Sequence, residues 1–166
     1  SMSGPRARIV ALLVLAMALA IGGCGFHMQR ATALPPGIHK VYVSGKDELS
    51  PFAVELRRAL DDAGAAVAPS AGEADAVIRV TQDRTGRRVL SVSARNTPQE
   101  YQIFYVIEFS ITRGEEQVVK PQAIELTRTY SFSESDLLAR DREENILREA
   151  MARDLADLVL RRLESL

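Results

Sequence analysis

The sequence predicts an α+β fold, a two-layer sandwich in which two helices cover one face of a four- to five-stranded, mostly antiparallel sheet. Three patterns predict it. A strand, a helix and a strand follow one another over residues 39–81, which implies one right-handed βαβ crossover. Every second residue is apolar over residues 101–111, as in a strand with one buried face. Apolar residues recur at helical spacing over residues 146–163, which predicts a second helix.

The first three elements of the folded part are predicted by residue type and spacing. Residues 39–44 (HKVYVS) alternate and are rich in β-branched residues, as in a short strand. Ser50 and Pro51 predict a helix start, because serine caps free N–H groups and proline fits the first turn. The apolar positions at helical spacing are Phe52, Leu56, Ala59, Leu60 and Ala63. Gly64 ends this run, and residues 74–81 predict the next strand.

Residues 83–88 (DRTGRR) predict a turn with Gly86 at its centre, followed by a strand at residues 89–94. The turn contains three arginines, Arg84, Arg87 and Arg88. We expect this basic cluster to lie at a hairpin tip, where it is solvated or contacts a partner rather than forming a primary ligand site. Asn96, Thr97 and Pro98 predict the following turn.

The strand predicted at residues 101–112 has two different faces. The apolar face, expected to pack against the helices, contains Tyr101, Ile103, Tyr105, Ile107, Phe109 and Ile111. The other face is mixed and contains Phe104 and Val106. Exposed apolar residues in a row mark interfaces, so this face is expected to dock on a partner. A turn at residues 113–115 leads to the last strand, at residues 123–132.

The last predicted element is a long helix. Asp141 and Glu144 have the spacing of a capping box, with Asp141 as the N-cap. The apolar stripe contains Ile146, Leu147, Ala150, Met151, Leu155, Leu158, Val159 and Leu163. The polar face has charges of both signs, whereas a helix on a membrane surface is mostly basic on that face. We therefore expect this helix to pack on the core.

Residues 1–23 have the pattern of a secretory signal peptide. Arg6 and Arg8 precede an uncharged apolar run at residues 9–21, shorter than the roughly 20 residues that span a bilayer. The run ends in Ile21-Gly22-Gly23-Cys24, which resembles the lipobox of bacterial lipoprotein precursors. The alternative is an uncleaved anchor with an incidental cysteine. We expect cleavage before Cys24 and lipid on its thiol, then a tether at residues 24–37 and a single α/β sandwich domain at residues 38–166.

Localisation follows from the same motif. Gly25 stands where an aspartate would retain a lipoprotein in the inner membrane, so the outer membrane is expected, with the protein lipid-anchored on its periplasmic side.

Composition argues against several other classes. The net charge of −1 gives no global reason to expect nucleic-acid binding. Cys24 is the single cysteine, so no internal disulfide is possible. His27 and His39 lack metal-ligand spacing and lie in or beside the tether, a poor place for a catalytic base. We therefore expect no enzyme activity, no catalytic or metal site and no cofactor.

Several short motifs occur in a characteristic order. They are Cys24-Gly25-Phe26, then Arg95, then Glu100-Tyr101-Gln102, then Arg128-Thr129-Tyr130-Ser131-Phe132, then Leu138-Ala139-Arg140-Asp141-Arg142-Glu143, and a terminal amphipathic helix with Arg161-Arg162-Leu163. This ordered set resembles the lipopolysaccharide-assembly lipoprotein family (LptE, also called RlpB) over nearly the whole chain.

The resemblance implies a non-enzymatic role. Its members look like plugs inside an outer-membrane β-barrel, the LptD-like lipopolysaccharide translocon, with a stoichiometry of about one to one. They help the barrel to fold and assist insertion of lipopolysaccharide into the outer leaflet. The alternative from another class is a free-standing periplasmic carrier lipoprotein that holds an apolar or anionic ligand between helix and sheet.

Lipopolysaccharide is anionic, so a protein that binds it is expected to offer clustered arginine or lysine. Arg95 and Arg140 match positions that are basic in the family pattern. We hypothesise that they form an anion-binding patch at one end of the sheet, with Arg142. The alternative is that they are solvated loop charges, with Arg140 paired to Asp136 or Glu144.

Overall fold

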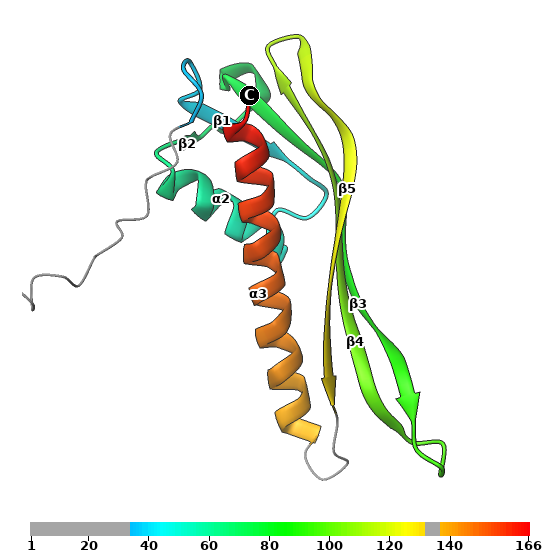
Figure 1. The fold of residues 1–166 in the computed structure, drawn as a ribbon. Coiled ribbons are helices and arrows are strands. Elements are labelled where there is room, and N and C mark those ends of the chain that lie inside the picture. The colour runs from blue at the N-terminus through cyan, green and yellow to red at the C-terminus, as the bar shows by residue number, and fades with distance from the viewer. Residues whose placement is uncertain (1–33, 132–136) are drawn as a thin grey trace, which may run out of the picture. The chain divides into compact units, whose positions relative to one another are not determined.

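The structure is a computed structural model, and it describes residues 34–131 and 137–166, with backbone only for 137–140. Figure 1 shows the elements along the chain. They are β1 (Lys40–Ser44), α2 (Pro51–Asp62), β2 (Ala66–Val67), a short 3-10 helix η1 (Ala71–Glu73), β3 (Ala76–Val92), β4 (Pro98–Arg113), β5 (Glu116–Ser131) and α3 (Leu137–Glu164).

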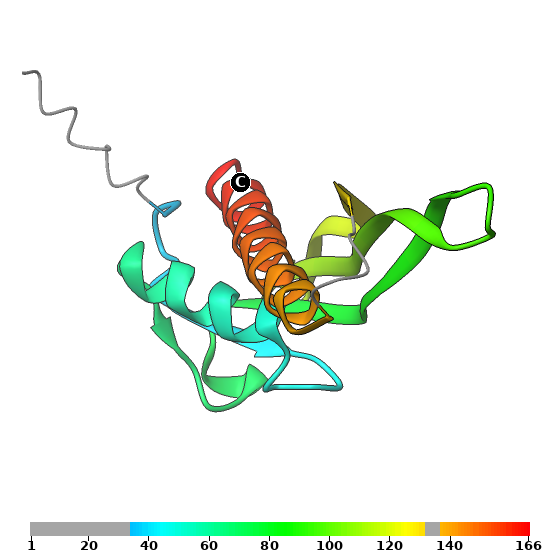
Figure 2. The same cartoon turned by 90° about the horizontal axis from the view of Figure 1, so that it is seen from below.

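The strands form one sheet in the order β2-β1-β3-β4-β5. β1 is parallel to β2 and β3, whereas β3, β4 and β5 pair antiparallel. The connection from β1 through α2 to β3 is the predicted crossover. Both helices lie on the same side of the sheet (Figures 1 and 2). The predicted fold class is therefore confirmed.

The turn predicted at residues 83–88 is wrong, because β3 runs through this segment without interruption and pairs with β4. Gly86 lies opposite Phe104 in the register. A Cβ atom at Gly86 would lie 2.6 Å from Cζ of Phe104. The glycine therefore allows an aromatic ring to lie against the backbone, and it does not reverse the chain.

The actual reversal between β3 and β4 follows residue 92. The N–H of Ser93 donates to the carbonyl of Thr97 at 2.7 Å, and Asn96 has the positive φ of 61° that a tight turn requires. The hydroxyl of Ser93 accepts from the N–H groups of Arg95 and Thr97. The turn predicted at residues 96–98 is thus displaced by a few residues towards the N-terminus.

The core lies between the helices and the sheet. All six residues of the predicted apolar face of β4 are buried, which confirms that face. On the opposite face Phe104 and Val106 are also buried, at 9% and 8% exposure, so the expected row of exposed apolar residues does not exist. The guanidinium groups of Arg84 and Arg88 lie over the Phe104 ring and cover it.

α2 begins as the sequence predicts. Ser50 is the N-cap, and its hydroxyl accepts from the N–H of Ala53 at 3.0 Å. The same hydroxyl donates to the carboxylate of Asp83 on β3 at 2.5 Å. Ser50 therefore fixes the start of the helix and ties it to the sheet.

α3 begins at Leu137, so Asp141 lies one turn inside the helix and the predicted N-cap there is wrong. Residues 137–140 (LLAR) are strong helix formers, which explains the earlier start. The C-terminal half packs on the core, as expected, through Met151, Leu155, Val159 and Leu163. Ile146, placed in the predicted stripe, is 58% exposed because it lies on the far side of the helix from Glu144.

The N-cap makes a testable contribution to stability. Replacing Ser50 by Ala should lower the free energy of unfolding by about 1 kcal/mol, because Ala53 loses its acceptor and Asp83 its donor. Urea unfolding followed by circular dichroism measures the change. Ser70 precedes η1 without a side-chain cap, so Ser70→Ala is the matched control and should shift stability by less than about 0.5 kcal/mol. Equal effects of the two changes would contradict the role of Ser50.

Candidate functional site

Two of the hypothesised lipopolysaccharide-binding residues, Arg95 and Arg142, lie at one end of the domain, which we call the hairpin end. It comprises the β3–β4 turn at residues 93–97, the last residues of β5 and the first turns of α3 (Figure 1). Arg95 is exposed at the tip of the turn, and Arg142 is exposed on α3. The side chain of Arg140 lies outside the described part of the chain, as does Asp136.

The described contacts do not join Arg95 to Arg142. Glu144, one suggested partner of Arg140, binds Arg87, Arg148 and Tyr130 among the described side chains. The structure thus brings two of the three hypothesised arginines to the same end of the domain without assembling them into a site.

The chain enters the domain at the opposite end, which we call the tether end. Pro35 is buried. The carbonyl of Pro36 accepts a hydrogen bond of 2.7 Å from the guanidinium of Arg113, which lies beside the β4–β5 turn. Gly37 has a φ of 85°, and the N–H of Ile38 donates to the carbonyl of Pro35. The chain is therefore fixed to the fold from these residues onwards. Cys24 lies outside the described residues.

A polar cluster that sequence reasoning missed lies between the sheet and the first half of α3. We call it the Glu144 cluster; it comprises Arg87, Tyr130, Glu144 and Arg148. The carboxylate of Glu144 is 2.8 Å from Nη1 of Arg87 and 3.0 Å from Nη2 of Arg148. It also accepts from the Tyr130 hydroxyl. Glu144 is only 4% exposed, so α3 is joined here to β3 and β5 by a buried carboxylate with several donors.

Two stacked tyrosine rings, Tyr101 and the cluster member Tyr130, lie at the Glu144 cluster. The rings of Tyr101 and Tyr130 stack with centroids 5.6 Å apart. The guanidinium of Arg87 lies over the Tyr101 ring, 5.3 Å from its centroid. The arginine is therefore held by a ring on one side and by a carboxylate on the other.

The pKa values of the cluster follow from its burial and its donors. Burial raises the pKa of the Glu144 carboxyl, but the hydrogen bonds from Tyr130 and Arg87 and the charges of Arg87 and Arg148 outweigh it, so the pKa is below its usual value. Burial, together with the bond to Glu144, raises the pKa of Tyr130 to about 12. The hydrogen bond to Glu144 raises the pKa of Arg87. Glu144 and Arg87 therefore form an ion pair at neutral pH, while the Tyr130 hydroxyl stays protonated and donates to it.

The other two arginines of the supposed hairpin tip lie on the opposite side of the sheet. We call this the open face: the side of β3, β4 and β5 away from the helices. Arg84 and Arg88 flank Phe104 there, with their guanidinium carbons 5.3 Å and 4.4 Å from the ring centroid. Nη2 of Arg88 is also 3.4 Å from the carboxylate of Glu125 on β5. The expected basic cluster at a hairpin tip is thus wrong in place and in composition.

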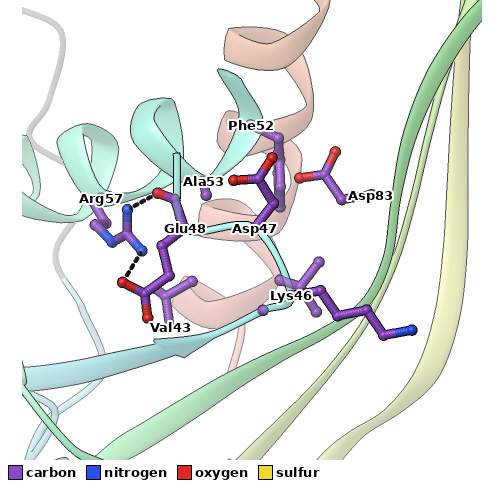
Figure 3. Close-up of a pocket in the computed structure, with 10 residues that line it drawn as sticks. Val43, Lys46, Asp47, Glu48, Phe52, Ala53, Arg57 and Asp83 are labelled. Carbon is purple, nitrogen blue, oxygen red and sulfur yellow. Dashed lines mark hydrogen bonds and ion pairs between the residues drawn. The ribbon is translucent and has the colours of Figure 1, made fainter. Parts of the chain in front are cut away.

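Figure 3 shows a pocket between the β1–α2 loop and α2. Arg57 closes one side by donating to the carbonyl of Glu48, with Asp83 on the other side. Its cavity volume of about 10 Å³ holds about one water molecule. An open groove of about 340 Å³ lies at the edge of the sheet, between β5 and the last turns of α3, beside Ile124 and Leu158. The pocket in Figure 3 is too small for a ligand of the predicted carrier.

Within residues 34–131 and 137–166, no three His, Cys, Asp or Glu residues are arranged so that they would hold a metal ion. In the same described segments no helix has the length and apolarity needed to cross a bilayer.

The fold and the site define a class of protein. The two-layer domain has Ser50 and Glu144 buried in contacts between its layers, and it has exposed arginines on the open face, at the hairpin end and on the helices. This arrangement is that of a binding or assembly domain. The family described as lipopolysaccharide-assembly, LptE, matches residues 38–163. The match covers most of the chain, which therefore belongs to this family of cell-envelope lipoproteins.

Individual relatives agree with this assignment. The chain is 26% identical over 153 residues to an LPS-assembly lipoprotein LptE of Pectobacterium atrosepticum, covering 91% of this chain and 83% of that protein. The crystal structure of rare lipoprotein B from Shewanella oneidensis is similar, with a TM-score of 0.67 and 25% identity over 76% of this chain and 94% of that one. A lipoprotein B from Nitrosomonas europaea has the same fold, with a TM-score of 0.71 and 24% identity over 82% and 88% of the chains.

The Glu144 cluster predicts a specific loss of stability. Glu144→Gln should lower the free energy of unfolding at pH 7 by about 2 kcal/mol, because charge-assisted hydrogen bonds from a buried site are lost. Hydrogen exchange should show the loss in the first half of α3 before the rest. Glu149 is exposed on the same helix, so Glu149→Gln is the control and should change little. Equal protection of α3 in both variants would contradict the role of the cluster.

The same carboxylate predicts a pH dependence. The pKa of Glu144 is lower in the folded than in the unfolded chain, so its stabilisation is complete above the unfolded pKa and is lost as the pH falls through the folded one. Urea unfolding between pH 7 and pH 3 should therefore show a decline that is smaller in Glu144→Gln. Identical pH profiles would show that Glu144 is not the group responsible.

Proposed function

We propose that this chain is an outer-membrane lipoprotein that plugs the lipopolysaccharide-transport β-barrel, helps it to assemble and assists insertion of lipopolysaccharide into the outer leaflet. The observation that supports the proposal most is the family match over residues 38–163, together with relatives named LPS-assembly lipoprotein. The polar, charged surface of the domain fits a barrel lumen, which is polar and is filled by a plug in some outer-membrane proteins. The role requires no catalysis.

The orientation of the plug follows from the two ends of the domain. The lipid on Cys24 would hold the tether end near the periplasmic leaflet. β4 joins the two ends, and its 16 residues make it about 50 Å long. A bilayer has a hydrocarbon core of about 30 Å. The hairpin end would therefore reach the level of the outer leaflet, where lipopolysaccharide is delivered.

At the hairpin end, Arg95, Arg140 and Arg142 are the proposed contacts for the phosphates of lipopolysaccharide. Arg95 and Arg142 are exposed there, and the backbone of Arg140 lies in the first turn of α3. The Glu144 cluster holds this part of α3 against β3 and β5. A fixed helix start lowers the entropy cost of presenting these charges to an anion.

The free-standing carrier has less support. It requires an enclosed ligand volume between the helices and the sheet, whereas the described core there is filled by buried side chains and the groove of about 340 Å³ between β5 and the end of α3 is open at the edge of the sheet. The pocket beside α2 holds only about 10 Å³.

Lipopolysaccharide binding tests the arginine patch. The double variant Arg95→Asp, Arg140→Asp should reduce lipopolysaccharide pull-down at least about tenfold, because two cations become repulsive anions. Arg58 and Arg153 are exposed on the helices, so their double change to Asp has the same charge difference and should have little effect. If the folded Arg95, Arg140 double variant binds lipopolysaccharide as well as the wild type does, the proposed arginine patch is wrong.

Purification from outer membranes tests the plug and its anchor. In mild detergent the wild-type lipoprotein should purify with a large β-barrel at about one to one. Cys24→Ser should fold normally, because the described core begins beyond it, yet it should assemble poorly at native expression levels. Full assembly without lipid would show that the anchor is dispensable, and a monomeric wild-type protein holding a small ligand would favour the carrier.

A further inference from the structure

The open face contains an arrangement that the lipid anchor and the hairpin end do not explain. Phe104 lies on Gly86, and the ring has Arg84 and Arg88 on either side of it along β3. The three residues of β3 alternate along the strand, so all of them point to the same side. This arrangement buries an aromatic ring under two charged groups on a surface that faces away from the core.

Stacking fixes the two guanidinium groups before any partner arrives. An arginine that lies on a ring has lost much of its side-chain freedom and gains a cation–π attraction. Arg88 has one weak partner, Glu125, and both members of that pair are about half exposed. For Arg84 the described residues provide no carboxylate. The ring therefore presents two ordered cations whose hydrogen-bonding capacity is largely unused.

Charge on the open face is divided by strand. β3 contributes an exposed basic row, Arg79, Arg84 and Arg88. Glu108 on β4 lies opposite Gln82, and Glu125 on β5 lies opposite Val106 of β4, so both carboxylates belong to the same face. The remaining residues of β4 and β5 on this side are mostly small or polar, among them Ser110, Thr127 and Thr129. The face is therefore positive along β3 and negative towards β5.

We propose that the open face is a docking surface for a protein wall of complementary charge, with partner carboxylates opposite the β3 row and partner cations opposite Glu108 and Glu125. The inference rests on the proposed function, because the wall is assigned to the lumen of the β-barrel. Carboxylates of the wall form bidentate pairs with Arg84 and Arg88, which stacking holds in place.

The charge division favours a protein over a lipid headgroup as the occupant. A polyanionic headgroup at Arg88 would also meet the carboxylate of Glu125, 3.4 Å from the guanidinium, and be repelled by it. A protein wall offers both signs in a fixed pattern and satisfies both rows.

Co-purification with the barrel, from cells that make the full lipidated chain, tests the proposal. Arg84→Glu with Arg88→Glu should reduce the amount of barrel recovered at least about tenfold, since two attractive pairs become repulsive. Gly86→Ala changes no charge but places a Cβ atom where the Phe104 ring lies, so it should displace the ring and its arginines and reduce recovery by about threefold or more. Circular dichroism melting checks that each variant is folded.

The matched control is Arg58→Glu with Arg153→Glu, which makes the same charge change on the helix layer and should alter recovery by less than about twofold. If the wild type recovers the barrel and the folded Arg84, Arg88 variant recovers as much, the docking surface is wrong and the proposed function stands. If the wild type recovers no barrel, both are wrong. If the variant loses lipopolysaccharide pull-down but keeps the barrel, the face binds a headgroup and the proposal is overturned.

Discussion

The uninterrupted pairing of β3 with β4 is the constraint on which the rest of the domain depends. It fixes which side of the sheet each residue faces, and so it separates Arg87, under α3, from Arg84 and Arg88 on the open face. It carries the turn at residues 93–97 far from the point where the chain enters. Gly86 leaves room at the middle of this pairing for the Phe104 ring, which a Cβ atom there would displace. A break at residue 86 would remove the hairpin end, the support for α3 and the cation–π stack together.

Sequence patterns were sufficient for the class of fold, the crossover, the cap at Ser50 and the buried face of β4, because each depends on local spacing or on one strong period. They failed in β3 for a physical reason. A register shift between Val80 and Gln82 breaks the period of two, so Val80 and Asp83 face the helices although three positions apart. Without a clear period of two, the charged residues and the glycine at residues 83–88 predicted a turn. The Glu144 cluster was missed for the same reason, since Arg87 joins Glu144 only when β3 extends this far.

The Glu144 cluster replaces apolar packing in the half of the sandwich nearest the hairpin end. The C-terminal half of α3 is buried through Met151, Leu155, Val159 and Leu163, whereas Glu144 is the buried residue among the described side chains at its start. A buried carboxylate with several donors adds little to net stability compared with leucine packing, but its hydrogen bonds form in only one arrangement of the helix and the sheet. It fixes the rotation of α3, and with it the direction in which Arg142 points.

β5 ends the sheet, and its outer edge has no strand beside it in the described residues. An unpaired edge of 16 residues is a template on which another chain can add a strand. Pro121 lacks an N–H group and Lys120 adds charge, which blunts the edge near the β4–β5 turn. From Ile124 to Ser131 the strand has no proline, and the charges of Glu125 and Arg128 are what blunt the edge there. Aggregation of a copy that has not bound its partner would begin along this stretch. Enclosure by a partner would therefore also prevent self-association through this edge.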